Sequence, residues 1–436
     1  MARTRVVCFG PGPKFKGGIS NYNTSLAKAL DRFDEVDVHI VSWTQQYPAI
    51  IPREFVDKSS KSDLLEGTNI EVEYVTNYNN PFSWRETVKV IKDLRPQLVI
   101  FQWAIAIQGL PMGYIANQLR KQTMAEVIFD LHFVVQKENS NIDRLFTRYG
   151  IRKAKTYVVH AHKTADELKA LFPKRRFEVS EDGTRSVRGR KSVIKLFHPV
   201  YDLFSPDPEF DVAAFKQEHG LGQHVFLFFG FIRKYKGLHH VIPAFKKLAD
   251  TRDDVSLLVC GESFWNTLKS NSFSTRLKKA VFGVAKKIFL SSKDNEQDYN
   301  PLQLVEDLGL QDRVMLVNEF VPNEDVHKYF QVSDCGVLFY EYATPSGVES
   351  LNYNFKLPIV ATRVGHFPET IREGFNGYLA EPEDINSMAE KMSLFLEKPI
   401  PRDNVAEAAK DFSWENYALA ILAERSVSET SESKAG

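Results

Sequence analysis

Short apolar runs alternate with helical patterns along this chain, and the alternation occurs twice. Most runs have the length of one strand, and helical segments such as Ile19–Leu30, whose apolar residues share one face, separate them. Strands that alternate with helices predict parallel sheets covered by helices, so we expect two doubly wound α/β domains facing each other across a cleft. The predicted strands are Arg5–Phe9, Val36–Val41, Ile70–Val75, Leu98–Phe101, Val127–Leu131, Thr156–His160 and Val193–Phe197 in the first half, and Val225–Phe229, Val255–Cys260, Val314–Val317, Cys335–Phe339 and Pro358–Ala361 in the second.

The chain is long enough for two separate cores. Its 436 residues exceed what one hydrophobic core usually serves. The segment Asp202–Phe210 contains two prolines and is typical of a linker. We therefore predict one domain over residues 1–204 and a second over 211–410. Residues 428–436 are rich in Ser and Glu, which predicts a disordered tail.

The composition is that of a globular protein with reduced thiols. The three cysteines, Cys8, Cys260 and Cys335, lie in apolar runs without the spacing of a metal site or a disulfide framework. Residues 1–8 lead directly into a strand and lack the apolar stretch of a secretory signal. The most apolar window, Gln97–Ala116, is interrupted by glutamines and a proline, which favours a strand and loop over a membrane span. These features predict a cytoplasmic protein.

Charge is unevenly distributed although the formal net charge is zero. Residues 1–204 hold 31 Lys and Arg against 22 Asp and Glu, and residues 151–200 hold 13 against 5. Such an excess predicts docking to an anionic membrane at its inner face, with a solvated loop as the alternative. Nucleic acid is disfavoured, because no aromatic interleaving or binding motif accompanies the charge. The basic cluster comprises Lys174, Arg175, Arg176, Arg185, Arg188, Arg190, Lys191 and Lys195.

A basic loop follows the first strand of the second half. The run Val225–Phe229 ends at Gly230, and Arg233, Lys234 and Lys236 come before a helix that starts near Leu238. Ligands of open α/β sheets bind at the carboxyl ends of the strands, and fixed cations there suit a diphosphate. The segment therefore indicates a nucleotide-linked leaving group, with a solvated basic turn as the alternative.

An ordered set of motifs gives the chain a family resemblance. The order of these motifs resembles family 4 of the retaining glycosyltransferases, which have the GT-B fold of two Rossmann-like domains. The resemblance covers nearly the whole chain, and it implies that residues 411–427 form a helix returning to the first domain. The motifs are G-x-x-R-x-x-K-G from Gly230, V-x-G-E from Val259, Ser333-Asp334, Ser346-Gly347-Val348, P-I-V-A-T-x-V-G-x-x-P-E from Pro358, G-x-x-G-Y-L-x-x-P-E-D from Gly374, the glycine-rich loop Gly10–Ile19, Asp130-Leu131-His132 and His198–Asp202.

The resemblance also implies roles for residues of the first domain. Gly17 and Gly18 allow close backbone approach to a donor phosphate or acceptor, and a simple tight turn is the alternative. His132 resembles the family histidine that faces the transferred sugar, and a histidine bonded to backbone is the alternative. The histidines His160, His162 and His198 are interpreted as structural.

In the second domain, the implied site surrounds the leaving phosphate. Arg233 and Lys236 would stabilise the charge that develops there, together with the backbone N–H groups of Ser346, Gly347 and Val348 at a helix start. Backbone groups near Glu319 and Val321 would bind the base. We expect no cofactor and no metal ion, because no cluster of carboxylates has metal-ligand spacing.

The positions that correspond to the two usual family glutamates depend on how the sequence is aligned with the family motif. Glu341 and Glu349 have the family spacing, with seven residues between them. Counting from Pro358 instead places the family positions on Ala343 and Leu351, so both usual glutamates are absent in this register. We then expect Glu349 to bind the ribose and Glu341 to have a structural or acceptor-side role.

The resemblance, together with these features, implies a metal-independent retaining hexosyltransferase. It would move a sugar from a UDP- or GDP-type donor to a polysaccharide or lipid-linked saccharide. A sugar-nucleotide epimerase of the same fold and a non-catalytic sugar-nucleotide-binding protein are the alternatives. The insertion 263–299 carries an apolar stripe flanked by basic residues, which either lies on a membrane or covers its own domain. The sequence does not identify the donor sugar, the acceptor, the linkage position or the oligomeric state.

Overall fold

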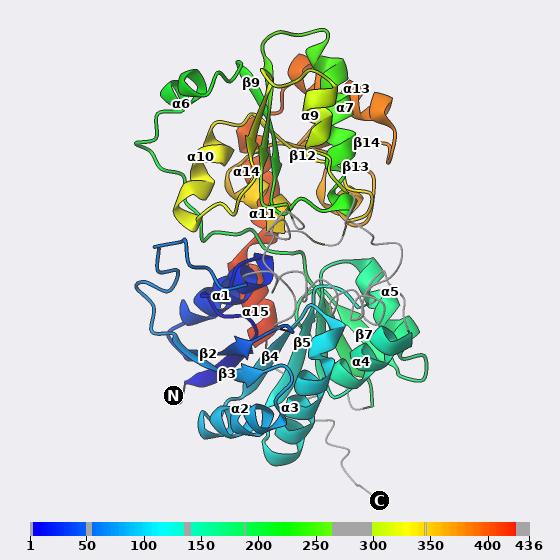
Figure 1. The fold of residues 1–436 in the computed structure, drawn as a ribbon. Helices are drawn as coiled ribbons and strands as arrows, with labels where there is room; N and C mark the ends of the chain where they lie inside the picture. The colour runs from blue at the N-terminus through cyan, green and yellow to red at the C-terminus, as the bar shows by residue number, and fades with distance from the viewer. Residues whose placement is uncertain are drawn as a thin grey trace, which may run out of the picture.

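The computed structural model describes residues 3–48, 55–134, 141–186, 189–263, 299–343, 345 and 347–423, which form two lobes (Figure 1). Each lobe is built on a sheet in which every neighbouring pair of strands is parallel. The first sheet contains β1 Thr4–Phe9, β2 Val36–Gln45, β3 Glu71–Asn77, β4 Leu98–Trp103, β5 Glu126–Leu131, β6 Thr156–Val159, β7 Phe177–Ser180 and β8 Lys191–Lys195. The second contains β9 His224–Phe229, β10 Val255–Cys260, β11 Val314–Val317, β12 Cys335–Leu338, β13 Ile359–Thr362 and β14 Gly377–Ala380.

Helices connect the strands. None in the described ranges is long and apolar enough to cross a membrane. The α-helices are α1 Gly18–Asp31, α2 Pro81–Asp93, α3 Gly109–Gln122, α4 Asn141–Ile151, α5 His162–Leu171, α6 Val212–Glu218, α7 Leu238–Ala249, α9 Gln303–Asp307, α10 Val326–Gln331, α11 Gly347–Asn354, α12 Phe367–Thr370, α13 Ile385–Glu397, α14 Arg402–Ala409 and α15 Trp414–Leu422. Short 3₁₀ turns are η1 Ala106–Gln108, η2 Lys234–Lys236, η5 Asn323–Asp325 and η6 Lys410–Phe412.

Both sheets are doubly wound, which confirms the predicted fold class. Their strand orders are β3-β2-β1-β4-β5-β6-β8-β7 and β11-β10-β9-β12-β13-β14. The order reverses beside β1 in one sheet and beside β9 in the other, and ligands of such sheets bind at the carboxyl ends of strands at this point. Every predicted strand is present to within two residues at each end, except that β2 continues to Gln45. The sequence prediction missed the edge strands β7 and β14.

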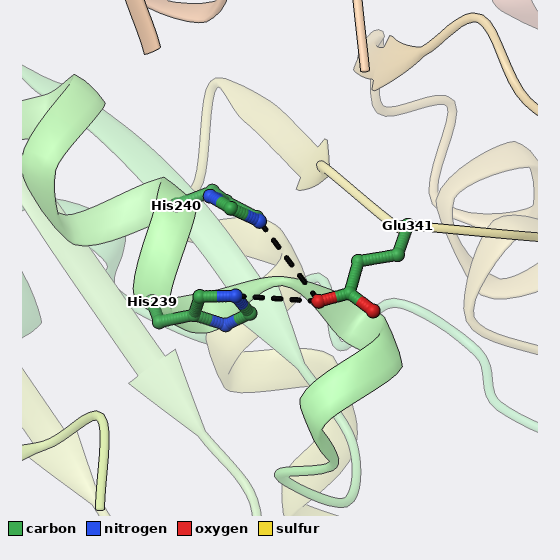
Figure 2. A group of neighbouring side chains, drawn as sticks. All are labelled: His239, His240 and Glu341. Atoms are coloured by element: carbon green, nitrogen blue, oxygen red, sulfur yellow. Dashed lines mark ion pairs between the residues drawn. The ribbon is translucent and has the colours of Figure 1, made fainter. Parts of the chain in front are cut away.

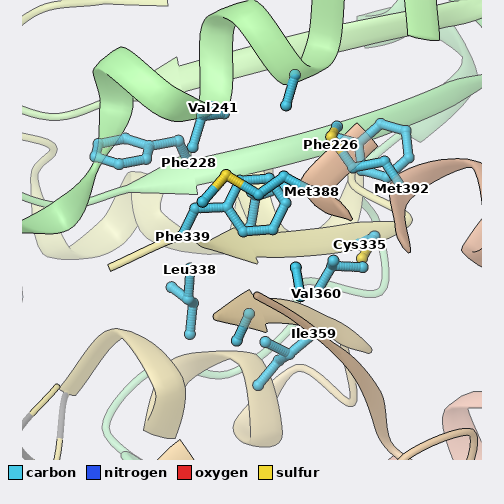
Figure 3. Packing of buried hydrophobic residues seen from close by; sticks show 14 of the residues in the cluster. Phe226, Phe228, Val241, Cys335, Leu338, Phe339, Ile359, Val360, Met388 and Met392 are labelled. Atoms are coloured by element: carbon cyan, nitrogen blue, oxygen red, sulfur yellow. The ribbon is translucent and has the colours of Figure 1, made fainter. Parts of the chain in front are cut away.

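Central strands are buried on both faces, which explains why they appear as continuous apolar runs. Val7 and Phe9 of β1 pack in one core cluster, while Val6 and Cys8 pack in another. In the second lobe, the core contains aromatic side chains from β9 and the residue after β12, together with side chains from α7 and α13 (Figure 3). All three cysteines are free and buried, as predicted.

Helix α15 ties the second lobe to the first. It follows α14 in the chain but packs beside α1 (Figure 1). Tyr417 Oη donates a hydrogen bond of 2.9 Å to Asp130 Oδ2 at the end of β5. The core cluster around this helix includes Tyr22 from α1 and Leu227 from β9, so it continues from one lobe into the other. Of the predicted returning helix 411–427, residues 424–427 lie outside the described ranges.

Two residues of the predicted basic surface cluster are instead buried. Arg185 is 6% exposed, and its Nε lies 3.2 Å from Glu126 Oε1. Its other nitrogens donate to the carbonyls of Ala420 and Ile421, at the carboxyl end of α15. Lys195 is also buried, with Nζ 3.7 Å from the centroid of the Phe197 ring. Sequence could not distinguish these internal cations from surface ones, because their partners are distant in the chain.

We predict that Arg185→Met lowers the free energy of unfolding by about 3–5 kcal/mol, because it removes the guanidinium that pairs with the buried Glu126 carboxylate and donates to the carbonyls of α15. Arg190→Met is the matched control, since its pair with Glu178 is exposed and contributes at most about 1 kcal/mol. Chemical denaturation measures both. The double variant Arg185→Met/Glu126→Gln should recover part of the loss. Equal losses in the two arginine variants would contradict the assignment.

Candidate functional site

A cavity of about 330 Å³ lies between the two lobes. Its walls come from residues that follow strands in both sheets, including His132 after β5, Gly230 after β9 and Glu262 after β10. The amino end of α1 contributes Gly17 and Gly18. The carboxyl ends of both parallel sheets therefore meet at one cavity, the position where doubly wound folds bind ligands.

Lys236 places a cation in the cavity wall. It ends the 3₁₀ turn η2, is 7% exposed and lines the cavity. Burial first, and repulsion from Arg233 second, lower the pKa of this ammonium to about 7. No carboxylate pairs with Lys236 in the part of the chain that the structure describes. At this pKa the amine is only partly protonated near pH 7, and an anion in the cavity would favour its charged form.

Two glycines make the Lys236 turn possible. Gly230 has φ 89°, and a Cβ there would lie 2.9 Å from Lys236 Nζ. Gly237 has φ 70°, and a Cβ there would lie 1.9 Å from the carbonyl oxygen of Phe339. Larger residues would have to shift the backbone or the ammonium. The glycines of the G-x-x-R-x-x-K-G motif thus let the turn pack closely at the end of β9.

Tyr201 bridges the two sides of the cavity. Its hydroxyl donates 2.7 Å to the carbonyl oxygen of Gly18, at the amino end of α1. A Cβ on Gly347 would approach the Tyr201 ring to 2.5 Å, so the start of α11 packs directly on this ring. Gly17 lines the cavity with φ 108°, in the region that favours glycine. The predicted glycine positions on both domains therefore meet around one aromatic side chain.

His132 lines the cavity from the first domain. Its Nε2 lies 2.8 Å from Gln102 Oε1, and the Tyr22 ring packs edge-on at 4.6 Å. With the Gln102 amide in this orientation its oxygen accepts from Nε2–H, and Nδ1 then keeps its lone pair. Burial, opposed by Asp130 and reinforced by His160, lowers the pKa of His132 to about 4. The imidazole is therefore neutral near pH 7.

Asp130 organises the layer behind His132. Its two carboxylate oxygens accept from His160 Nε2 at 2.8 Å and from Tyr417 Oη at 2.9 Å. Burial by itself raises the pKa of this carboxyl, but His160 and the hydrogen bonds lower it below its usual value. Register explains the grouping, because Asp130 and Gln102 are paired on β5 and β4. The sequence prediction noted Asp130 and His160, yet missed the partners Gln102 and Tyr417.

Carboxylates line the cavity on the second-domain side. Glu262 and Glu319 follow β10 and β11, and Glu319 lies with Val321 in the wall. In the sequence, Phe320 lies between Glu319 and Val321. The Lys16 ammonium of the first domain lies 4.4 Å from the centroid of the Phe320 ring. The segment predicted to bind a base therefore faces the glycine-rich loop of the first domain.

Three predicted site residues are placed differently from the others. Arg233 is half-buried and is not among the residues that line the cavity. Its charge contributes, after burial, to lowering the pKa of Lys236. Glu349 is 4% exposed and also absent from the lining, because its carboxylate accepts from Thr370 and pairs with His366. Gly347, Val348 and Leu351 of α11 do line the cavity. Ser346 lies outside the described residues.

Comparisons with known proteins agree with this geometry. Residues 210–412 match the family model described as Glycosyl transferases group 1. The chain is 22% identical over 330 residues to N-acetyl-alpha-D-glucosaminyl L-malate synthase of Bacillus anthracis, covering 74% of this chain and 72% of that protein.

Solved structures resemble the chain over nearly its whole length. The complex of Anabaena HepE with UDP-glucose matches with a TM-score of 0.62 and 16% identity, covering 96% of this chain and 98% of that one. Sucrose-phosphate synthase from Thermosynechococcus elongatus matches with a TM-score of 0.59 and 15% identity, covering 96% and 97%. At this identity the likeness establishes the fold, which is GT-B with two Rossmann-like domains.

We predict that anion affinity falls as pH rises through the range where Lys236 loses its proton. With a pKa of about 7 in the free protein, binding above that pH requires proton uptake, so the dissociation constant rises roughly tenfold per pH unit. Sulfate is a suitable probe, since its charge is constant there. Calorimetric titration at several pH values measures the slope. Lys236→Met should abolish it and Lys234→Met should not; a wild-type affinity independent of pH would contradict the prediction.

Proposed function

This chain has the GT-B fold, and its residues 210–412 belong to the glycosyl transferases group 1 family; from that premise we propose a specific reaction. The protein is a glycosyltransferase that moves a sugar, with retention of configuration, from a nucleoside-diphosphate sugar to a saccharide acceptor. The single observation that carries the proposal is the buried Lys236 cation, which shares one interdomain cavity with the neutral imidazole of His132.

In the proposed reaction, Lys236 stabilises the leaving diphosphate. Negative charge grows on the phosphate as the glycosidic bond breaks, and a fixed, buried cation beside it lowers that barrier. The backbone N–H groups of Gly347 and Val348, in the first turn of α11, add donors on the same wall. Arg233 does not line the cavity, but its charge adds positive potential at Lys236. These groups supply the charge that a metal ion would otherwise provide, so we propose metal-independent transfer.

His132 approaches the transferred sugar from the first domain in this proposal. Its Nδ1 lone pair accepts a hydrogen bond from a sugar hydroxyl, while Gln102 holds Nε2 and fixes the ring. Because the imidazole is neutral, it adds no repulsion to the positive charge that develops on the sugar. The glycine-rich loop with Gly17 and Gly18 forms the acceptor side.

Recognition of the nucleoside falls to the second domain. Glu262 and Glu319 line the cavity and supply carboxylates for the ribose hydroxyls. In the register counted from Pro358, Leu351 stands where the usual family glutamate would be, so another carboxylate is needed. The Glu349 carboxylate holds α11 in place through His366 and Thr370 rather than binding ribose directly. The HepE complexes contain UDP and UDP-glucose, so UDP-glucose is the first donor to test. We propose a polysaccharide or lipid-linked saccharide as acceptor.

A basic surface supports the proposed contact with an anionic membrane. Arg120, Lys153 and Arg175 lie close enough to Lys191 to lower its pKa, which burial first and these charges second bring to about 8. Lys121 and Arg152 act in the same way on Lys153. The basic edge is our name for the group Arg120, Lys121, Arg152, Lys153, Arg175 and Lys191. It lies near the amino ends of β5, β6 and β8. Beside it, Met124 is 96% exposed. Anionic lipid headgroups match its charge.

Lys236→Ala should lower sugar transfer roughly a hundredfold while the protein stays folded, because loss of one stabilising contact costs about 3 kcal/mol of barrier. Lys234→Ala, an exposed neighbour in the same turn, is the matched control and should stay near wild type. Transfer is measured as UDP release from a panel of nucleotide sugars with and without lipid extract. Activity of Lys236→Ala within twofold of wild type would show that the turn is not at the phosphate.

The same panel separates the three function classes. Release of nucleotide that depends on an acceptor supports the transferase. Conversion of a nucleotide sugar without any acceptor identifies an epimerase, and binding without turnover identifies a non-catalytic protein. L-malate belongs in the acceptor panel, because the Bacillus anthracis relative is named for it.

Sedimentation with anionic vesicles tests the basic edge. Changing Arg120, Lys121, Arg152 and Lys153 to Gln should weaken binding at low salt by roughly two to three orders of magnitude, at about 1 kcal/mol per charge. Changing four exposed lysines elsewhere, Lys61, Lys247, Lys398 and Lys410, is the matched control. Neutral vesicles should not bind. Absence of wild-type binding to anionic vesicles at any salt concentration would remove the proposal.

A further inference from the structure

Two histidines and a glutamate converge outside the cavity, on the second domain. His239 and His240 belong to the first turn of α7, and Glu341 follows β12 (Figure 2). One ligand atom from each of the three lies within 4.8 Å of the others. None of the three lines the cavity. We propose that this cluster is a zinc-binding site.

The distances match the donor spacing around a small transition-metal ion. His239 Nε2 lies 3.3 Å from Glu341 Oε1, and His240 Nε2 lies 3.9 Å from the same oxygen. Tetrahedral ligands about 2.0–2.1 Å from zinc are about 3.3–3.4 Å apart, so the first distance agrees and the second requires a small rotation of the His240 ring. Three protein ligands leave a fourth position for water.

Surrounding groups prepare the cluster for a cation. His239 Nδ1 lies 3.0 Å from Tyr299 Oη, which can accept its hydrogen and leave the Nε2 lone pair directed at the metal position. With the hydrogen on Nδ1, Nε2 of His239 carries none, which is the form of imidazole that binds a metal ion.

Nearby charges both oppose and favour a cation. Lys234 adds positive potential at both histidines, whereas the Glu383 carboxylate adds negative potential at His240. Glu341 contributes the one carboxylate among the ligands. Two nitrogen donors and one oxygen donor select zinc over magnesium or calcium, which prefer oxygen ligands throughout.

The location connects the proposed site to the cavity wall. Lys236 precedes His239 by three residues and Tyr340 directly precedes Glu341, and both Lys236 and Tyr340 line the cavity. The backbone N–H of Glu341 also donates 2.8 Å to the carbonyl oxygen of Tyr235. Zinc would therefore fasten the turn that carries Lys236 to the loop after β12.

Calorimetric titration of the metal-free, untagged full chain with zinc chloride tests the site. We expect saturable binding of one zinc ion, weakened roughly 10- to 100-fold or more in His239→Ala and in Glu341→Gln. The double variant His162→Ala/His219→Ala, which removes two exposed histidines, is the matched control and should bind like wild type. Magnesium should not compete. Since no activity enters the measurement, the outcome is independent of the proposed transferase function.

Hydrogen exchange locates the ion. Zinc should slow exchange of the backbone amides at the start of α7 in the wild-type chain and not in Glu341→Gln, whose fold is checked by circular dichroism. The proposal is overturned if wild-type protein shows no saturable zinc binding, or if the His239 and Glu341 variants bind zinc as tightly as wild type. Either result would leave a cluster held by hydrogen bonds alone.

Discussion

The buried ammonium of Lys236 imposes the constraint around which the site is arranged. It sits in the wall of the interdomain cavity without a carboxylate partner in the described part of the chain, and burial brings its pKa to about 7. Stability alone would favour pairing this charge or exposing it to water. Its position is instead maintained by a turn that requires glycine at 230 and 237, so the backbone conformation holds this amine in the cavity wall.

A second constraint is the shared core of the two domains. Helix α15 packs on α1, and Tyr417 from this helix completes the hydrogen bonds of Asp130 behind His132. Arg185 holds the carboxyl end of the same helix through two backbone carbonyls. Since His132 and Lys236 lie in different domains, their relative position depends on contacts of this kind. Loss of these contacts is therefore expected to affect the site as well as stability.

The elements that succeeded as sequence predictions share a local origin. Parallel strands buried on both faces leave continuous apolar runs, so β1, β4 and β9 could be found without any tertiary information. The edge strand β7, Phe177–Ser180, alternates polar and apolar residues and gave no such signal. The predicted site residues Lys236, Gly17 and His132 all line the cavity, and each lies in a short motif directly after a strand or before a helix.

By itself, the sequence determined the two α/β domains, the ordered motifs of group 1 glycosyltransferases and the cation after β9, because each depends on neighbours within a few residues. Tertiary structure alone decided that Arg185 is internal, that Glu349 bonds to His366 and Thr370, and that Glu341 meets His239 and His240. Each of these contacts joins residues that lie from about twenty to more than two hundred positions apart in the sequence. The packing of the folded chain brings such residues together, so the local pattern of apolar and polar residues does not predict the contacts.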